Sequence, residues 1–170
     1  MIQAKKKNTN LSENKDKPVI FTLKGFKIVR FNMVEPGLDI VNGFEIQKLK
    51  VGYNLDFSYS MEQNGFQVIA AVIYQYNLNG SDIQLLELAL MADYHISEIK
   101  NIIEISGDNF RIPDDLLVNF VSIAFSTARG ILFAKTQGSF LNQFILPLID
   151  PKSIVQQKLK SLETKPTKKL

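Results

Sequence analysis

The chain has 170 residues, with no cysteine and a single histidine, His95. Without cysteine it can form no disulfide, thiolate metal site or cysteine nucleophile. A base role would rest on His95 alone, which we interpret as an ordinary hydrogen-bonded structural histidine. Asp114 and Asp115 follow a proline and are typical of a helix start, and no glycine spacing suits a phosphate. We therefore expect no enzyme, no catalytic residue, no metal and no cofactor.

Long apolar runs are also missing from the sequence. No segment reaches the roughly 18 to 20 consecutive apolar residues that a membrane span needs. Residues 1–17 are polar and lysine-rich, unlike a signal peptide. These features predict a soluble, cytoplasmic protein without membrane insertion.

The net charge of +3 is unevenly distributed along the chain. Residues 1–17 sum to +3 and residues 152–170 to +5, which leaves −5 for residues 18–151. An acidic centre repels phosphate backbones, so we do not expect nucleic acid as a partner. We predict a disordered basic N-terminal segment at 1–17, one folded domain at 18–163 and a basic tail at 164–170.

The first part of the domain alternates apolar and polar residues from Pro18 to about Val34. The phase of this alternation changes around Gly25, which predicts one long strand with a bulge or bend there. Residues 35–43 contain breakers at both ends and no clean period. We predict a crossover loop at this place.

Three more strands are predicted downstream. Residues 49–61 alternate strictly, which is typical of a strand with one solvated face. Asn64 and Asn79, each followed by glycine, are hairpin residues: the first separates 49–61 from 66–76, and the second separates 66–76 from 83–96. Periodicity alone would also allow a helix over 83–91, but two consecutive turn signals favour a meander.

The C-terminal part changes to a helical period. Pro113 opens a long helix with a wide apolar stripe, which Gly138 can stop. Residues 140–149 are predicted to be extended and apolar, and Asp150 caps a second helix from Pro151 to about Leu162. The fold class is α+β: a four-stranded antiparallel sheet, a meander with a crossover loop after strand 1, with both helices on one face.

The chain is rich in large apolar residues, with 12 Phe and 5 Tyr. Several lie in segments predicted to be irregular, where loops usually carry fewer of them. They are Leu38, Ile40, Phe44, Phe140, Phe144 and Leu148. Such residues either pack onto the core or into an oligomer interface, or they line a groove for apolar segments of other chains.

Two stretches resemble the SecB export-chaperone family, over roughly residues 18–160. The helix PDDLLVNFVSIAFSTARGILFAKTQG, with Ala128 and Arg129, is similar to that family's tyrosine-alanine-arginine helix leading to a glycine turn. GSFLNQFILPLI, from Gly138, is similar to its apolar segment before the last helix. The resemblance implies an ATP-independent holding chaperone that binds unfolded polypeptide or preprotein clients.

The resemblance also implies specific residues and partners. It implies a dimer formed through the sheet edge and helices, often paired into a tetramer. For Arg129 we expect a structural role in a buried or interface ion pair. The expected peptide-binding residues are Phe44, Ile46, Phe140, Leu141, Phe144 and Leu146.

Several alternatives stay open. The family's C-terminus is adapted to the SecA motor, whereas residues 165–170 here are basic, so a SecA-type partner is undecided. A SecB-like dedicated chaperone, for example of a toxin-antitoxin system, would use the same binding physics. A non-chaperone oligomeric adaptor would bury the same apolar loops in its own interfaces.

Overall fold

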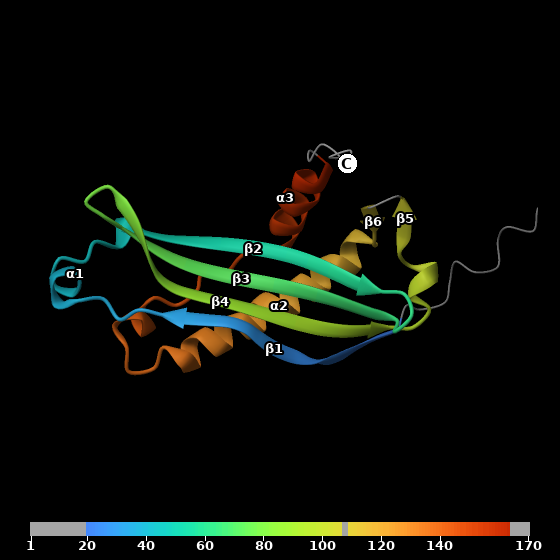
Figure 1. Ribbon diagram of the computed structural model, residues 1–170, viewed down its shortest axis with the longest axis horizontal. Helices are drawn as coiled ribbons and strands as arrows, with labels where there is room; N and C mark the ends of the chain where they lie inside the picture. The colour runs from blue at the N-terminus through green and yellow to red at the C-terminus, as the bar shows by residue number, and fades with distance from the viewer. Residues whose placement is uncertain (1–19, 107–108, 164–170) are drawn as a thin grey trace, which may run out of the picture.

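The computed structural model describes residues 20–106 and 109–163. The predicted segments 1–17 and 164–170 lie outside this part. Figure 1 shows one long sheet with the longest helix running along one of its faces. The elements are β1 (Phe21–Met33), α1 (Leu38–Asn42), the 3₁₀ turn η1 (Ile46–Lys48), β2 (Leu49–Ser60), β3 (Gly65–Leu78), β4 (Ser81–Ile96), η2 (Ile99–Asn101), β5 (Glu104–Ser106), β6 (Asn109–Arg111), α2 (Asp114–Lys135), η3 (Phe140–Gln143) and α3 (Pro151–Glu163).

The sheet is antiparallel with the strand order β1-β4-β3-β2. Strands β2, β3 and β4 form the predicted meander, and β1 pairs with β4. The segment between β1 and β2 therefore carries the chain across the sheet to its far edge. The predicted α+β class is confirmed, and the crossover contains the short helix α1 where the sequence predicts only a loop.

The bend predicted near Gly25 is confirmed. The pairing of β1 with β4 shifts register between Leu23 and Gly25, and again between Ile28 and Arg30. An extra residue in one strand increases the local twist. The two shifts fit the curved path of β1 along the sheet (Figure 1).

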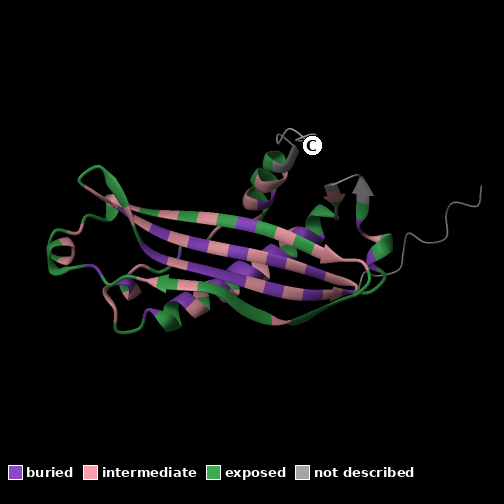
Figure 2. Cartoon of the chain, in the orientation of Figure 1, coloured by how far each residue is buried: buried purple, intermediate pink, exposed green. Residues whose placement is uncertain are grey.

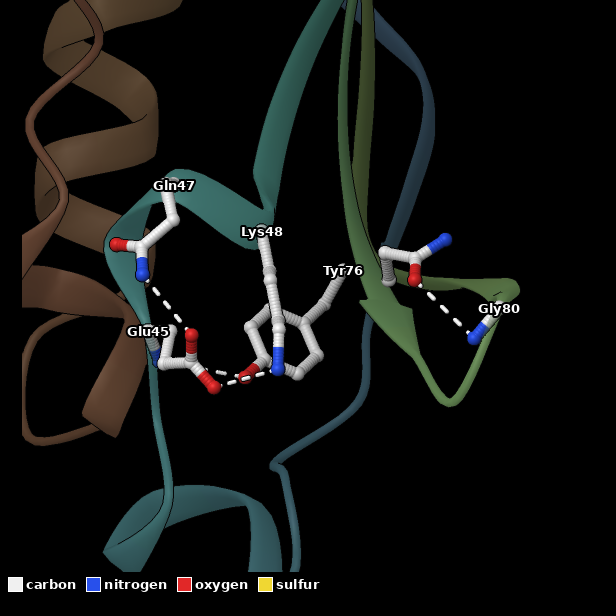
Figure 3. Close-up of polar contacts among 6 residues, drawn as sticks. Glu45, Gln47, Lys48, Tyr76 and Gly80 are labelled. Atoms are coloured by element: carbon white, nitrogen blue, oxygen red, sulfur yellow. Dashed lines mark hydrogen bonds and ion pairs between the residues drawn. The ribbon is translucent and has the colours of Figure 1, made fainter.

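Both predicted hairpins are present and use left-handed backbone. Asn64 has a φ of 50°, while Asn79 and Gly80 have φ values of 52° and 87°. Asn77 also accepts a hydrogen bond from the Gly80 amide at 3.2 Å, drawn in Figure 3. Asparagine and glycine adopt positive φ at low cost, so these residues favour tight turns between neighbouring strands. The segment after the second turn is strand β4, as the two turn signals predict, and not a helix.

The core lies between the sheet and α2. Along β3 every second side chain, from Phe66 to Tyr76, is buried, because α2 packs over β3 and β4. Helix α2 is long and apolar enough to cross a membrane by length and composition, a test that core helices also pass. Its buried residues pack into this core, so the chain has an α+β fold of the type found in soluble proteins.

The C-terminal segments differ from expectation in detail. The segment predicted as extended begins with η3, where the Ser139 hydroxyl accepts a hydrogen bond from the Leu141 amide at 3.2 Å. Helix α3 begins as predicted, because the Asp150 carboxylate accepts bonds from the amides of Lys152 and Ser153. The antiparallel pairing of β5 with β6 is not predicted, since three-residue strands carry too little pattern.

Candidate functional site

Four rings from three separate segments meet at one end of the sheet. Phe44, from the crossover, stacks on Tyr76 of β3 with ring centroids 4.8 Å apart. The same ring lies 5.2 Å from Phe140 and 4.7 Å from Phe144, which belong to η3 and its end. We call Phe44, Tyr76, Phe140 and Phe144 the aromatic cluster. It joins the crossover to the segment before α3, about 100 residues later in the chain.

Polar contacts fix the crossover side of the cluster. The Tyr76 hydroxyl accepts a hydrogen bond from the Glu45 amide at 3.3 Å, shown in Figure 3. The Glu45 carboxylate is paired with Lys48 and accepts a bond from Gln47. The hydrogen bond from Lys48 lowers the pKa of Glu45, and the same bond raises the pKa of Lys48. At the other side, the Phe140 amide donates to Glu35 Oε1 at 2.6 Å.

One side chain of the sheet and one of α2 hold the segment after η3. The Tyr74 hydroxyl donates to the Phe144 carbonyl at 3.0 Å, and burial raises the pKa of Tyr74 to about 12. Arg129 on α2 donates through Nε to the Leu146 carbonyl at 3.0 Å and through Nη2 to the Pro147 carbonyl at 2.8 Å. Arg129 therefore holds this segment through two backbone carbonyls, and it has no ion pair within residues 20–106 and 109–163; the expected role in an interface ion pair stays a prediction.

The six predicted peptide-binding residues fall into three groups. Phe44, Phe140 and Phe144 are half-buried in the aromatic cluster. Leu141 and Leu146 are core residues with 1% and 3% exposure, so another chain reaches them only if the segment moves. Ile46 is 60% exposed on η1. Their role in peptide binding stays a prediction.

Further apolar side chains lie exposed on the two segments that the cluster joins. On the crossover, Leu38 is 77% exposed. On the segment before α3, Ile145 and Leu148 are 67% and 87% exposed. None of these three residues is among the predicted peptide-binding residues, although Leu38 and Leu148 are apolar residues in segments that the sequence predicts to be irregular. Exposed apolar side chains on both segments make this region attractive to other apolar surfaces.

A shallow hollow lies beside the cluster. It is bounded by the C-terminal half of α2 and residues 142–146, with an empty volume of about 270 Å³ that includes space open to solvent. Phe133, Phe144 and Ile145 supply apolar walls, and Thr136 with Asn142 supplies polar ones. Because this volume includes space open to solvent, the hollow is a surface depression and does not define a ligand cavity.

The residues considered for chemistry lie apart from this region. His95 is half-buried near the end of β4, opposite Thr22 and Gly65. Asp114 and Asp115 are exposed in the first turn of α2, as expected for helix-start residues. Within 20–106 and 109–163 no group of three or more His, Asp or Glu side chains is arranged to hold a metal ion.

The chain matches no protein-family profile and no curated protein. Among solved structures it is similar to a protein of unknown function from Streptococcus agalactiae, with 10% identity and a TM-score of 0.34, over 71% of this chain and 90% of the other. A similarity at this TM-score carries no argument about function.

Proposed function

We propose that this protein is an ATP-independent holding chaperone that binds unfolded or preprotein polypeptide at the apolar surface around the aromatic cluster. The observation that carries the proposal is the exposure of Leu38, Ile46, Ile145 and Leu148 on the two segments that the cluster joins. Apolar surface gives non-directional affinity, which tolerates many client sequences. The resemblance of residues 113–149 to the SecB family supports the same function.

The geometry suggests how a client would be held. Its apolar side chains would pack on the exposed rim, beside the hollow that Phe133 and Phe144 line. Deeper contact with Leu141 or Leu146 requires the segment held by Arg129 to shift. Affinity would then include the cost of breaking hydrogen bonds to two backbone carbonyls.

We propose a cytoplasmic homo-oligomer, dimer or tetramer, that serves either protein export or a dedicated client. Size-exclusion chromatography with light scattering, with and without an unfolded client, would report the oligomer and the client complex together.

An oligomeric adaptor is the second candidate function. The exposed side chains of Leu38 and Leu148 favour it equally, because a second copy could cover them. Binding of a hydrophobic dye to the native oligomer separates the two candidates. A chaperone leaves apolar surface exposed for clients, whereas an adaptor that buries this surface in its own interfaces binds neither dye nor peptide.

The direct test is suppression of the aggregation of a chemically unfolded client without ATP, followed by light scattering. The wild type should suppress aggregation at stoichiometric ratios, and the double variant Ile46→Ser/Leu148→Ser should lose most of this effect. Both side chains are exposed, so the fold should be kept. The matched control is Ile20→Ser, 61% exposed before β1. Equal activity of all three proteins would contradict the assigned site.

A further inference from the structure

Strand β1 leaves one edge of the sheet open. It pairs with β4 on one side, and in the described part of the chain no strand pairs with its other side. Figure 2 shows β1 largely exposed, next to strands that alternate between buried and intermediate residues. With 13 residues it is long for an edge strand, and it presents a row of free backbone donors and acceptors.

One face of this edge is apolar. Phe21, Leu23, Phe26 and Ile28 lie opposite buried residues of β4 and therefore point toward the helix side of the sheet. Their exposure is 38–39%, because α2 packs on β3 and β4 and leaves β1 partly uncovered. The apolar face of the sheet thus continues beyond the helix that covers it.

The other face of the edge is cationic. Lys27 lies opposite Met91, on the helix-free face of the sheet, and Lys24 is exposed at the first bulge. Neither lysine has an ion pair among the described residues, while Arg30 is paired with Glu87 at 2.7 Å. Asp93 of β4 lies on the same face, opposite Gly25, and accepts a hydrogen bond from Gln67. The edge therefore combines an apolar side with a side that carries two lysines outside any ion pair of the described residues.

This charge pattern argues against a second copy of the same strand. Two β1 strands pairing antiparallel about their middle would bring Lys24, Lys27 and Arg30 of one copy near the same residues of the other. Like charges that face each other across a ladder are destabilising, and lysines on an edge oppose edge-to-edge pairing. An acidic partner strand would instead gain from both lysines.

We propose that the β1 edge is a second polypeptide-binding site, which adds an extended segment with alternating apolar and acidic residues as a fifth strand. Backbone hydrogen bonds provide affinity for any extended segment. The apolar side chains of the segment pack beside Phe26 and Ile28, and its carboxylates lie beside Lys24 and Lys27. The site is separate from the aromatic cluster and does not depend on the function proposed there.

The experiment measures fluorescence anisotropy with labelled peptides of the length of β1. A peptide alternating valine and glutamate should bind, whereas the valine–lysine peptide should bind at least about tenfold more weakly at low salt. A valine–glutamate peptide with proline at every other glutamate should also lose at least about tenfold, because proline cannot donate to the ladder. Equal binding of all three peptides, or binding of none, would overturn the proposal.

A charge reversal makes the test specific to β1. Lys27→Glu should remove most of the preference, and the double variant Lys24→Glu/Lys27→Glu should reverse it so that the valine–lysine peptide binds more tightly. Both side chains are exposed, so a folding defect is unexpected. Sedimentation velocity checks the competing occupant: a dimer that is lost in a Phe26→Asp variant would assign this edge to a second copy and overturn the proposal. Client protection by the aromatic cluster, measured with Ile46→Ser/Leu148→Ser, fails or holds independently of these results.

Discussion

The two edge strands of the sheet, β1 and β2, have similar sequences in pattern but opposite surroundings. Both alternate apolar residues toward the helix side. On β2 this side is covered, with Leu55 only 3% exposed and α3 packed against the strand and α2. On β1 the equivalent side is open, with Leu23 at 38%. An alternating pattern therefore predicts a strand, while the cover over it depends on which edge the last helix reaches.

The helix-side face of β2 is covered through a chain of contacts that β1 lacks. Arg129 holds the segment leading into α3, and Asp150 caps the helix. Lys158 of α3 then pairs with Asp56 of β2 at 2.6 Å. Cover over this face adds to stability, whereas the open face of β1 is available for binding. Neither β1 nor β2 has a further strand on its outer side among the described residues, so the two strands differ in the cover of this face.

The largest difference should come from matched leucine truncations. Leu55→Ala should lower the free energy of unfolding by about 2–5 kcal/mol, because the side chain is buried in the core. Leu23→Ala should cost about 1 kcal/mol, since more than a third of the side chain already contacts solvent. Urea denaturation followed by circular dichroism measures both. Equal losses would mean that β1 is covered in solution, by a second copy or another molecule.

High pH should destabilise the covered centre of the sheet. Burial raises the pKa of Tyr74 on β3 and of Tyr94 on β4 to about 12. An unfolded tyrosine has a pKa near 10, so between about pH 10 and 12 the unfolded state holds fewer protons, and stability falls as pH rises. Each tyrosine should contribute up to about 3 kcal/mol to this fall.

Urea midpoints across this pH range measure the effect, and Tyr74→Phe should remove part of the slope. The buried Tyr94 hydroxyl donates to the Phe120 carbonyl at 3.1 Å, so Tyr94→Phe should act similarly. Ultraviolet titration of the tyrosines in the native protein should show groups ionising near pH 12. A slope unchanged in both variants would contradict the assignment to these two side chains.

Two arginines extend the comparison to the contacts beside each edge. Arg129→Ala should lower stability by about 1.5–3 kcal/mol, because two carbonyls lose charge-assisted donors. Arg30→Ala on β1 removes an exposed ion pair and should cost about 0–1 kcal/mol. Hydrogen exchange at 145–149 should increase only in the Arg129 variant. No local increase there would exclude a clamping role for Arg129.

Most of the fold was predictable because its signals are local. The alternation in 49–61 and the glycines after Asn64 and Asn79 depend on neighbouring residues only, and β2, β3 and β4 follow them closely. The wide apolar stripe of α2 likewise predicted a helix buried against the sheet. Periodicity and turn chemistry act within a few residues, so one chain is enough to recognise them.

The candidate site was predictable only in part, because it depends on long-range contacts. Phe44 and Phe144 were both selected from the family resemblance, and the structure brings them together in one cluster. Leu141 and Leu146 carry the same apolar character but are buried, which sequence pattern does not distinguish from exposure. The carbonyl partners of Arg129 could not be predicted from the sequence either, because every residue has a backbone carbonyl and composition does not distinguish one from another.

The smallest effect should come from the ion pair that links α3 to β2. Lys158 is mostly buried along its side chain while Asp56 is 66% exposed, so solvent screens the pair at one end. Asp56→Asn should therefore cost about 0–1 kcal/mol, and less at high salt. Lys158→Ala should cost more than Asp56→Asn, because it also removes the packed aliphatic stem. If Asp56→Asn instead matched Leu55→Ala in urea midpoint, the edge would be held by charge, and the cover by α3 would not explain the difference between β1 and β2.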